Sequence, residues 1–287
     1  MMNIKDKFLQ LSGTCFSLAL LLCSSNAYTA ESKIKYFGHA AFEVTTPGGK
    51  VFYIDPWITN PGNPKGKEDL AKIEKADYIL ITHGHSDHVG DAVTLAKKTG
   101  AKLVASVELG SNLVRIMGFP EKQAGIDTLG NPGGELKLPG GEVTIAFTPA
   151  VHSSGLDYPE GNEGKSSKPV TYGGTPVGFI LQIKGGPTIY HTGDTAYFKD
   201  METIGETYSP DLSLINIGGH FGMEPRMAAK AASAVKSKLV VPHHFKTFPT
   251  LTQDTQAFFA DLDKKGIPHL EMQPGSVVVF DGRKLKK

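Results

Sequence analysis

Short apolar runs typical of β-strands alternate along the chain with longer patterns of helical period. The first part of the sequence is rich in strands, and Pro47-Gly48-Gly49 between two of them is typical of a hairpin turn. We predict strands at 34–37, 41–45, 51–55, 78–82 and 102–105, and helices at 89–98 and 108–117.

The second half repeats this alternation without any sequence repeat of the solenoid kind. We predict strands at 143–147, 177–183, 188–190, 212–217, 239–241 and 276–280, and helices at 225–237 and 253–264. Strands gathered early in each half, with helices following, predict a layered α/β sandwich of two similar halves.

The N-terminal segment has the order of a secretory signal. Lys5 and Lys7 precede an apolar stretch at 9–23, and small residues follow up to Ala27. The stretch is short for a membrane anchor, which is the competing interpretation. We therefore expect residues 1–27 to be a signal peptide, residues 28–287 to form one mature domain, and the mature protein to be periplasmic or secreted.

Composition and charge limit the classes of binding partner that we expect. Both cysteines, Cys15 and Cys23, lie in the leader, so cleavage would leave a chain without thiol chemistry. Removing the leader changes a net charge of +1 to zero, with 28 basic and 28 acidic residues. We expect a small-molecule substrate, no nucleic acid and, after cleavage, no membrane as partner, and we leave a homo-oligomer open.

The strongest chemical signal is the run His83-Gly84-His85-Ser86-Asp87-His88, which directly follows a predicted strand and precedes a predicted helix. Side chains two residues apart in an extended segment point the same way, so His83 and His85 can bind one ion. The chain then turns, so that Asp87 and His88 can face a second ion. Imidazole and carboxylate are ligands that zinc, manganese and iron accept.

Three later residues complete a ligand set, each after a predicted strand. They are His152, Asp194 in Thr192-Gly193-Asp194-Thr195, and His244 in Pro242-His243-His244. A lone histidine after a strand is more often structural, but ligands at strand ends are what a rigid scaffold needs to bring groups together at one point.

This order of ligands resembles the metallo-β-lactamase superfamily. Tyr36-Phe37-Gly38-His39, Ile54-Asp55-Pro56-Trp57, Gly193-Asp194-Thr195 and the two motifs around His83 and His244 resemble one branch of it more closely. That branch holds bacterial metal-dependent hydrolases and the related L-ascorbate-6-phosphate lactonase. The resemblance covers nearly the whole mature chain and implies an αββα sandwich of two mixed sheets with outer helices.

The resemblance also implies how the ligands divide. His83, His85 and His152 would hold one metal, Asp87, His88 and His244 the other, and Asp194 would bridge them. Two divalent ions, zinc expected and manganese or iron as alternatives, would hold a hydroxide that attacks an ester, lactone or phosphoester-type substrate. Asp87 and Asp194 are then the candidate catalytic carboxylates, and Asp87 can also orient the water.

Other residues have weaker signals. Asp55 is expected to orient a metal-bound imidazole, with a turn-forming role before Pro56 as the alternative. His39, Trp57 and His220 are equally consistent with a pocket role and a structural one, and His191 is expected to be structural.

The sequence also departs from the branch. His243 stands where relatives usually have Met, so the choice of His244 as ligand depends on alignment. Gly222 and Glu224 differ from the usual pattern, the export signal is uncommon, and the loop 153–175 is longer than usual. This loop has five glycines, two prolines and four serines, and we expect a substrate flap or a plain surface insertion, with Tyr158 and Tyr172 as candidate substrate contacts.

Three alternatives remain. A true β-lactamase generally lacks the bridging carboxylate that Asp194 supplies. A mononuclear-iron oxidoreductase of the same fold would bind one iron rather than two ions. A non-catalytic exported metal-binding protein is the third, although a bridged pair of ions suits water activation better than storage.

Overall fold

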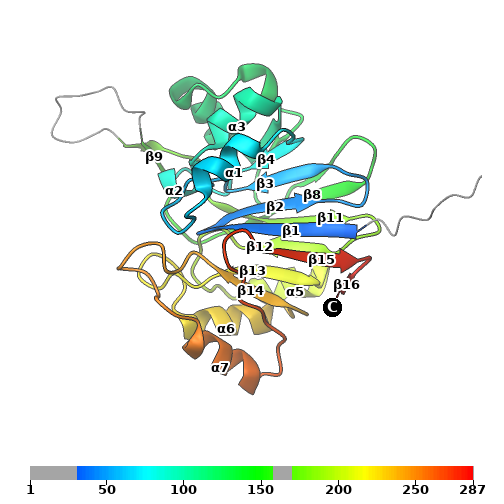
Figure 1. The fold of residues 1–287 in the computed structure, drawn as a ribbon, viewed down its shortest axis with the longest axis vertical. Coiled ribbons are helices and arrows are strands. Elements are labelled where there is room, and N and C mark those ends of the chain that lie inside the picture. The colour runs from blue at the N-terminus through cyan, green and yellow to red at the C-terminus, as the bar shows by residue number, and fades with distance from the viewer. Residues whose placement is uncertain (1–30, 158–169, 287) are drawn as a thin grey trace, which may run out of the picture.

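The computed structural model describes residues 31–157 and 170–286. The expected signal peptide and Tyr158 lie outside this part of the chain. Figure 1 shows two β-sheets stacked face to face, with α1 and α3 outside one sheet and α6 and α7 outside the other. The αββα sandwich expected from the sequence is therefore confirmed.

The first sheet has eight strands in the order β16-β15-β1-β2-β3-β4-β5-β6, and β3 to β6 run parallel. Its strands are β1 Glu31–Gly38, β2 Ala41–Thr45, β3 Val51–Ile54, β4 Tyr78–Leu80, β5 Lys102–Ser106, β6 Leu129–Gly130, β15 Val277–Asp281 and β16 Lys284–Leu285. The second sheet has six strands in the order β14-β13-β12-β11-β8-β7, and β12 to β14 run parallel. Its strands are β7 Glu135–Lys137, β8 Val143–Pro149, β11 Val177–Ile183, β12 Thr188–His191, β13 Leu212–Asn216 and β14 Val240–His243.

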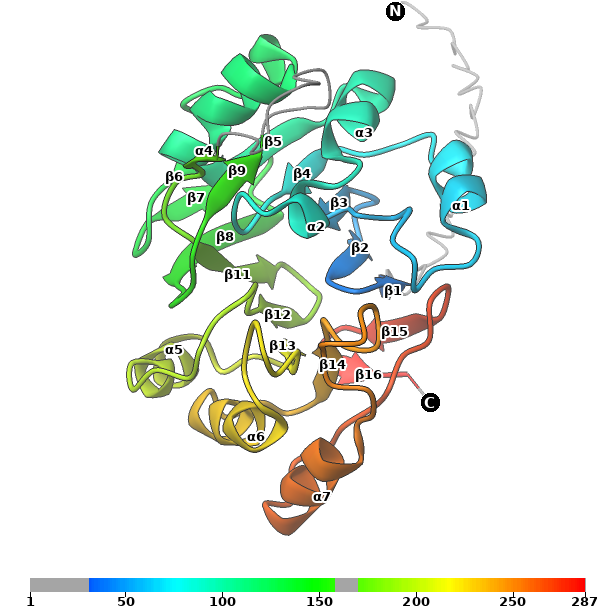
Figure 2. The same cartoon turned by 90° about the vertical axis from the view of Figure 1, so that its left-hand side faces the viewer.

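The helices cover the outer faces of the two sheets (Figure 2). They are α1 Gly66–Lys72, α2 Ser86–Val89, α3 Ala92–Thr99, α4 Val107–Asn112, α5 Met201–Tyr208, α6 Pro225–Ala234 and α7 Gln256–Lys264, with a π-helical turn at Leu113–Met117 and a 3₁₀ turn at Glu121–Gln123. The helix predicted at 89–98 is observed as α3, but it begins three residues later, because Gly90 adopts φ 38° and ends the preceding helix α2 at Val89. Helices α1 and α5 were not predicted.

Buried apolar side chains form three cores between the layers. The central core lies between the sheets and includes Phe42, Phe52, Phe147 and Phe179, all buried. The other two lie under the helices, one against each sheet. Within the described residues no helix is both long and apolar enough to cross a membrane.

The loop predicted at 153–175 has structure at both of its ends. Strands β9 Gly155–Asp157 and β10 Val170–Tyr172 pair antiparallel in a small ribbon. The ribbon lies against the histidine-rich motif, because a Cβ atom on Gly84 would meet the backbone of Gly155 and Gly173 at 2.9 and 3.1 Å. Glycine at position 84 is therefore needed for this close approach.

Candidate metal centre

All seven predicted ligands come together at one edge of the sandwich, beyond the carboxyl ends of the parallel strands. The motif 83–88 follows β4, Asp194 follows β12 and His244 follows β14. Each of these strands belongs to a parallel run of its sheet, and the carboxyl ends of such strands bring side chains far apart in sequence to one place. His152 reaches the same place from the end of β8, which lies in the second sheet.

The ligand atoms form groups small enough to hold one ion each. His83, His85 and His152 form one group whose ligand atoms all lie within 4.8 Å of one another. Asp87, His88 and His244 lie in another group of the same compactness, which also contains His39. Apart from His39, these are the two sets that the family resemblance implied.

Asp194 lies between the two groups. Its Oδ2 atom is 3.6 Å from His152 Nε2 in the first group, and 3.4 and 3.0 Å from the Nε2 atoms of His88 and His244 in the second. Ligand atoms about 2.0–2.1 Å from a tetrahedral zinc ion are themselves about 3.3 Å apart. The separations around Asp194 therefore fit ligands of shared metal ions.

The unpaired nitrogens support the same conclusion. His88 Nε2 and His244 Nε2 are buried and have no hydrogen-bond partner in the described structure, although carboxylate oxygens lie near them. An orphaned buried nitrogen is costly unless an unseen group pairs with it. The residues present therefore fit divalent metal ions.

Charges in the second group favour a cation there. Burial alone would lower the pKa of His88, but the carboxylates of Asp194, Asp55 and Asp87 outweigh it and hold this pKa well above its usual value. Burial likewise opposes the charge on His244, but Asp194 and Asp87 raise its pKa to about 9. A site that stabilises positive charge on two imidazoles also suits a divalent ion that replaces their protons.

The first group is electrostatically different. Burial, and next the neighbouring His88, lower the pKa of His83 well below its usual value. The pKa values of His85 and His152 are also lowered, chiefly by burial. Neutral imidazoles are the form that binds metal, so this group is prepared for an ion at neutral pH.

Asp55 contacts the second group as predicted for a carboxylate that orients an imidazole. It is fully buried, and its Oδ2 lies 2.8 Å from His88 Nδ1. The backbone N–H of Thr82 donates to Oδ1 at 2.8 Å, and the Thr82 hydroxyl donates to Oδ2 at 2.7 Å. These bonds direct His88 Nε2 toward Asp194.

Three of the six non-glycine residues with positive φ in the described structure lie at this site. His39, Asp55 and His244 have φ values of 53°, 45° and 61°, in the left-handed region that few non-glycine residues adopt. Each such residue costs about 1–3 kcal/mol, and strain of this kind clusters at functional sites.

The two adjacent histidines take different positions. His244 enters the ligand cluster, whereas the buried His243 stacks on His191 with ring centroids 4.6 Å apart. His191 Nε2 lies 3.1 Å from the carbonyl of Ala40, and its Nδ1 accepts from the N–H of Gly193. His191 thus contacts backbone groups, and His243 packs against His191 outside the ligand cluster.

His39, Trp57 and His220, for which the sequence favoured neither a pocket role nor a structural one, lie in different surroundings. His39 is buried and lies with Asp87, His88 and His244 in one group. Trp57 is half-buried beside it, with ring centroids 5.3 Å apart. His220 is exposed and packs against Phe221.

Sequence reasoning missed Asn216, the last residue of β13. Its amide nitrogen donates to Asp194 Oδ1, and its Oδ1 accepts from the N–H of Gly218 at 2.9 Å. A Cβ on Gly222 would lie 2.2 Å from this Oδ1, so glycine is required there. The available signal was a polar residue at the end of an apolar strand parallel to the ligand-bearing strands.

Comparison with known proteins shows the family of the chain. The model of the Beta-lactamase superfamily domain matches residues 50–245. A UPF0173 metal-dependent hydrolase of Thermodesulfovibrio yellowstonii is 46% identical over 88% of this chain and 92% of its own length. A UPF0173 metal-dependent hydrolase of Anaeromyxobacter sp. is 47% identical over 88% of this chain and 89% of its own.

Solved structures agree as well. Igni18, a metallo hydrolase of Ignicoccus hospitalis, superposes with a TM-score of 0.74 at 37% identity, covering 87% of this chain and 98% of that one. The metallo-beta-lactamase fold protein YhfI of Bacillus subtilis shares the fold with a TM-score of 0.61 at 13% identity, covering 88% of this chain and 100% of that one. The chain therefore belongs to the UPF0173 metal-dependent hydrolases of the beta-lactamase superfamily, and it is a metal-dependent hydrolase of the metallo-β-lactamase fold.

Proposed function

We propose that this chain is a dinuclear hydrolase that acts on an ester, lactone or phosphoester-type small molecule. The observation that carries the proposal is the position of Asp194 Oδ2, within 3.0–3.6 Å of imidazole nitrogens from both ligand groups. One carboxylate oxygen shared in this way can bridge two cations. Two divalent ions bound there would supply a hydroxide nucleophile at neutral pH and polarise the substrate oxygen under attack.

The protein residues have separable tasks in this proposal. His83, His85 and His152 would hold the first ion, and Asp87, His88 and His244 would hold the second. Asn216 fixes the Asp194 carboxylate through Oδ1, which leaves Oδ2 facing imidazoles of both ligand groups.

Solvent access is provided by the more open ligands of the site. His85, Asp87 and His152 are half-buried, whereas His83 and His88 are fully buried. Substrate would therefore approach from the side of His85, Asp87 and His152, and Asp87 would orient the attacking water.

Metal analysis and a hydrolysis screen test the proposal together. Purified protein loaded with Zn²⁺, Mn²⁺ or Fe²⁺ would be assayed on lactone, aryl ester, phosphodiester and β-lactam substrates, and its metal content measured. Two ions per chain with turnover of a lactone, ester or phosphodiester is the expected result. A single iron would instead favour an oxidoreductase, and two ions without any turnover would favour a binding protein.

We also propose that the chain is exported and cleaved after Ala27, on the strength of the charged, apolar and small-residue order of its first 27 residues. N-terminal sequencing of protein from fractionated cells tests this. A mature chain that begins at Tyr28 outside the cytosol is expected, and an intact Met1 in the cytosolic fraction would contradict the proposal.

A further inference from the structure

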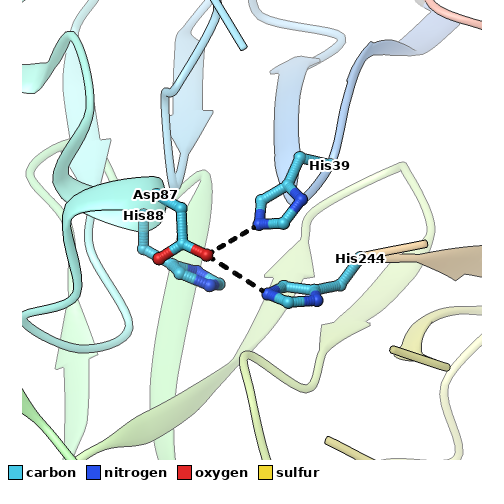
Figure 3. A group of neighbouring side chains, drawn as sticks. All are labelled: His39, Asp87, His88 and His244. Atoms are coloured by element: carbon cyan, nitrogen blue, oxygen red, sulfur yellow. Dashed lines mark hydrogen bonds and ion pairs between the residues drawn. The ribbon is translucent and has the colours of Figure 1, made fainter. Parts of the chain in front are cut away.

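His39 contacts the second ligand group although it is not one of the seven predicted ligands. Its side chain is fully buried, and its Nε2 lies 3.0 Å from Asp87 Oδ2. Figure 3 shows the Asp87 carboxylate facing the rings of both His39 and His244, with His88 beside it. The contact therefore joins His39 to a residue that the proposed function gives to the second ion.

The partners of the ring define its hydrogen positions. A carboxylate only accepts hydrogen bonds, so His39 Nε2 carries a hydrogen and donates to Asp87. In the neutral ring Nδ1 then accepts, and the Thr247 hydroxyl lies 2.9 Å from it. The other acceptor for that hydroxyl, the carbonyl oxygen of Phe245, is farther away at 3.3 Å. The bonds therefore run from Thr247 through His39 to Asp87.

This chain of bonds crosses between the two halves of the fold. His39 lies in the turn between β1 and β2, Asp87 follows β4 of the same sheet, and Thr247 follows β14 of the other sheet. The His39 carbonyl accepts from the backbone N–H of His244 at 2.8 Å and from the Tyr36 hydroxyl at 3.0 Å. His39 is thus tied both to Asp87 and to the segment that carries the ligand His244.

The number of donors argues against His39 as a ligand itself. Asp87, His88, His244 and the shared Asp194 already offer the second ion four donors, and the proposed hydroxide would take a further position, so His39 is not needed as a ligand. Carboxylates that bind metal are usually held by further hydrogen bonds, and the loss of such a partner typically costs 10–100-fold in metal affinity or activity.

We propose that His39 is a positioning residue whose Nε2–H holds Asp87 toward the second ion, and that the Thr247 hydroxyl fixes the ring by donating to Nδ1. The role rests on the proposed dinuclear centre. It also accounts for the left-handed backbone of His39, a conformation that brings the ring to Asp87 while its carbonyl faces His244.

The test is a titration of metal-free protein with Zn²⁺ alone in competition with a chromophoric chelator, which gives two successive dissociation constants. Thr247→Val removes the hydroxyl at constant shape. It is expected to weaken binding of the second ion about 10–100-fold and to leave the affinity for the first ion unchanged. Thr247→Ser should restore the affinity. Thr99→Val is the matched control, because Thr99 also donates a hydroxyl hydrogen bond, to Leu95, but far from the ligands.

Two further variants separate positioning from ligation. His39→Gln keeps an N–H near the position of Nε2 but is a poor zinc ligand, so it should retain the second ion, whereas His39→Leu should lose it by the same 10–100-fold. Thermal unfolding of the metal-free variants identifies any that fail to fold, and a folded Thr247→Val still tests the positioning role even if a His39 variant does not fold.

The outcomes are distinct. Two ions in the wild type and unchanged second-site affinity in folded Thr247→Val would overturn the role of His39 alone. Equal and severe loss in His39→Gln and His39→Leu would make His39 a ligand and overturn it too. A wild type that binds only one ion would overturn the dinuclear proposal itself, and the positioning role with it.

Discussion

Asp55→Asn is expected to weaken binding of the second metal ion while leaving the fold intact. Asp55 is fully buried and accepts from the Thr82 N–H and hydroxyl and from His88 Nδ1, all at 2.7–2.8 Å. The substitution keeps the size of the side chain but replaces one acceptor oxygen by an NH₂ donor. In either amide orientation, a donor then faces the Thr82 N–H or His88 Nδ1–H.

His88 can relieve that conflict only by moving its proton from Nδ1 to Nε2. The proton then occupies the nitrogen that faces Asp194 and the second ion, so the ligand lone pair is lost. Loss of such an orienting partner typically costs 10–100-fold in metal affinity. Since each tenfold is about 1.4 kcal/mol, the expected weakening is about 1.4–2.8 kcal/mol.

The assay is the same Zn²⁺ titration against a chelator, with the free energy of unfolding measured in parallel by denaturant. Asp211→Asn is the matched control, because Asp211 is also buried and accepts from three groups, the Thr188 N–H, Lys238 and Arg283, away from the ligands. The control should lose stability and keep both ions. Wild-type affinity for the second ion in folded Asp55→Asn would refute the tautomer argument.

Three further predictions concern the metal ligands, Asp211 and the loop. Asp194→Asn should lose at least one ion and nearly all turnover. His244→Ala should lose mainly the second ion, whereas His243→Ala should keep both. Metal analysis that shows the reverse for the two histidines would exchange their roles. Burial would raise the pKa of Asp211, but the hydrogen bonds that its carboxylate accepts lower this pKa in the folded protein. The ionised carboxylate therefore stabilises the fold above the unfolded pKa of about 3.9, and this stabilisation is lost as pH falls through the lower folded pKa. Asp211→Asn should therefore be about 1–3 kcal/mol less stable than wild type at pH 7, and denaturant titrations should show the gap closing at lower pH; a gap independent of pH would contradict this. Replacing 158–169 by a short turn tests the flap interpretation: unchanged metal content with a large fall in kcat/KM supports it, and unchanged kinetics would make the segment a surface insertion.

The paired ends of the loop have to be kept in that experiment. Replacement of the whole segment 155–173 would remove β9, β10 and the glycine contacts with Gly84, and Ser154 donates to the carbonyl of Gly173 while accepting from the N–H of Gly84. A metal defect would then follow from damage to the motif itself. Keeping the paired ends confines the change to the segment between them.

Much of the site could be predicted from sequence because its ligands have local signals. The motif 83–88 places five polar residues directly after an apolar strand, and strand period and turn together indicate two facing ions. Asp194 and His244 also follow apolar strands, and alignment to the family favoured His244 over its neighbour. The layered α/β class followed from the alternation of strand and helix patterns.

Contacts between distant segments were decided only by the tertiary structure. Asn216, Thr82 and Thr247 contact Asp194, Asp55 and His39 over separations of 22, 27 and 208 residues, and a polar residue at a strand end does not by itself identify its partner. The sequence determined which residue types can bind metal and where strands end. Only the packing of two sheets fixed which carboxylate faces which imidazole, because that depends on strand order and on backbone turns such as those at His39 and His244, which periodicity does not encode.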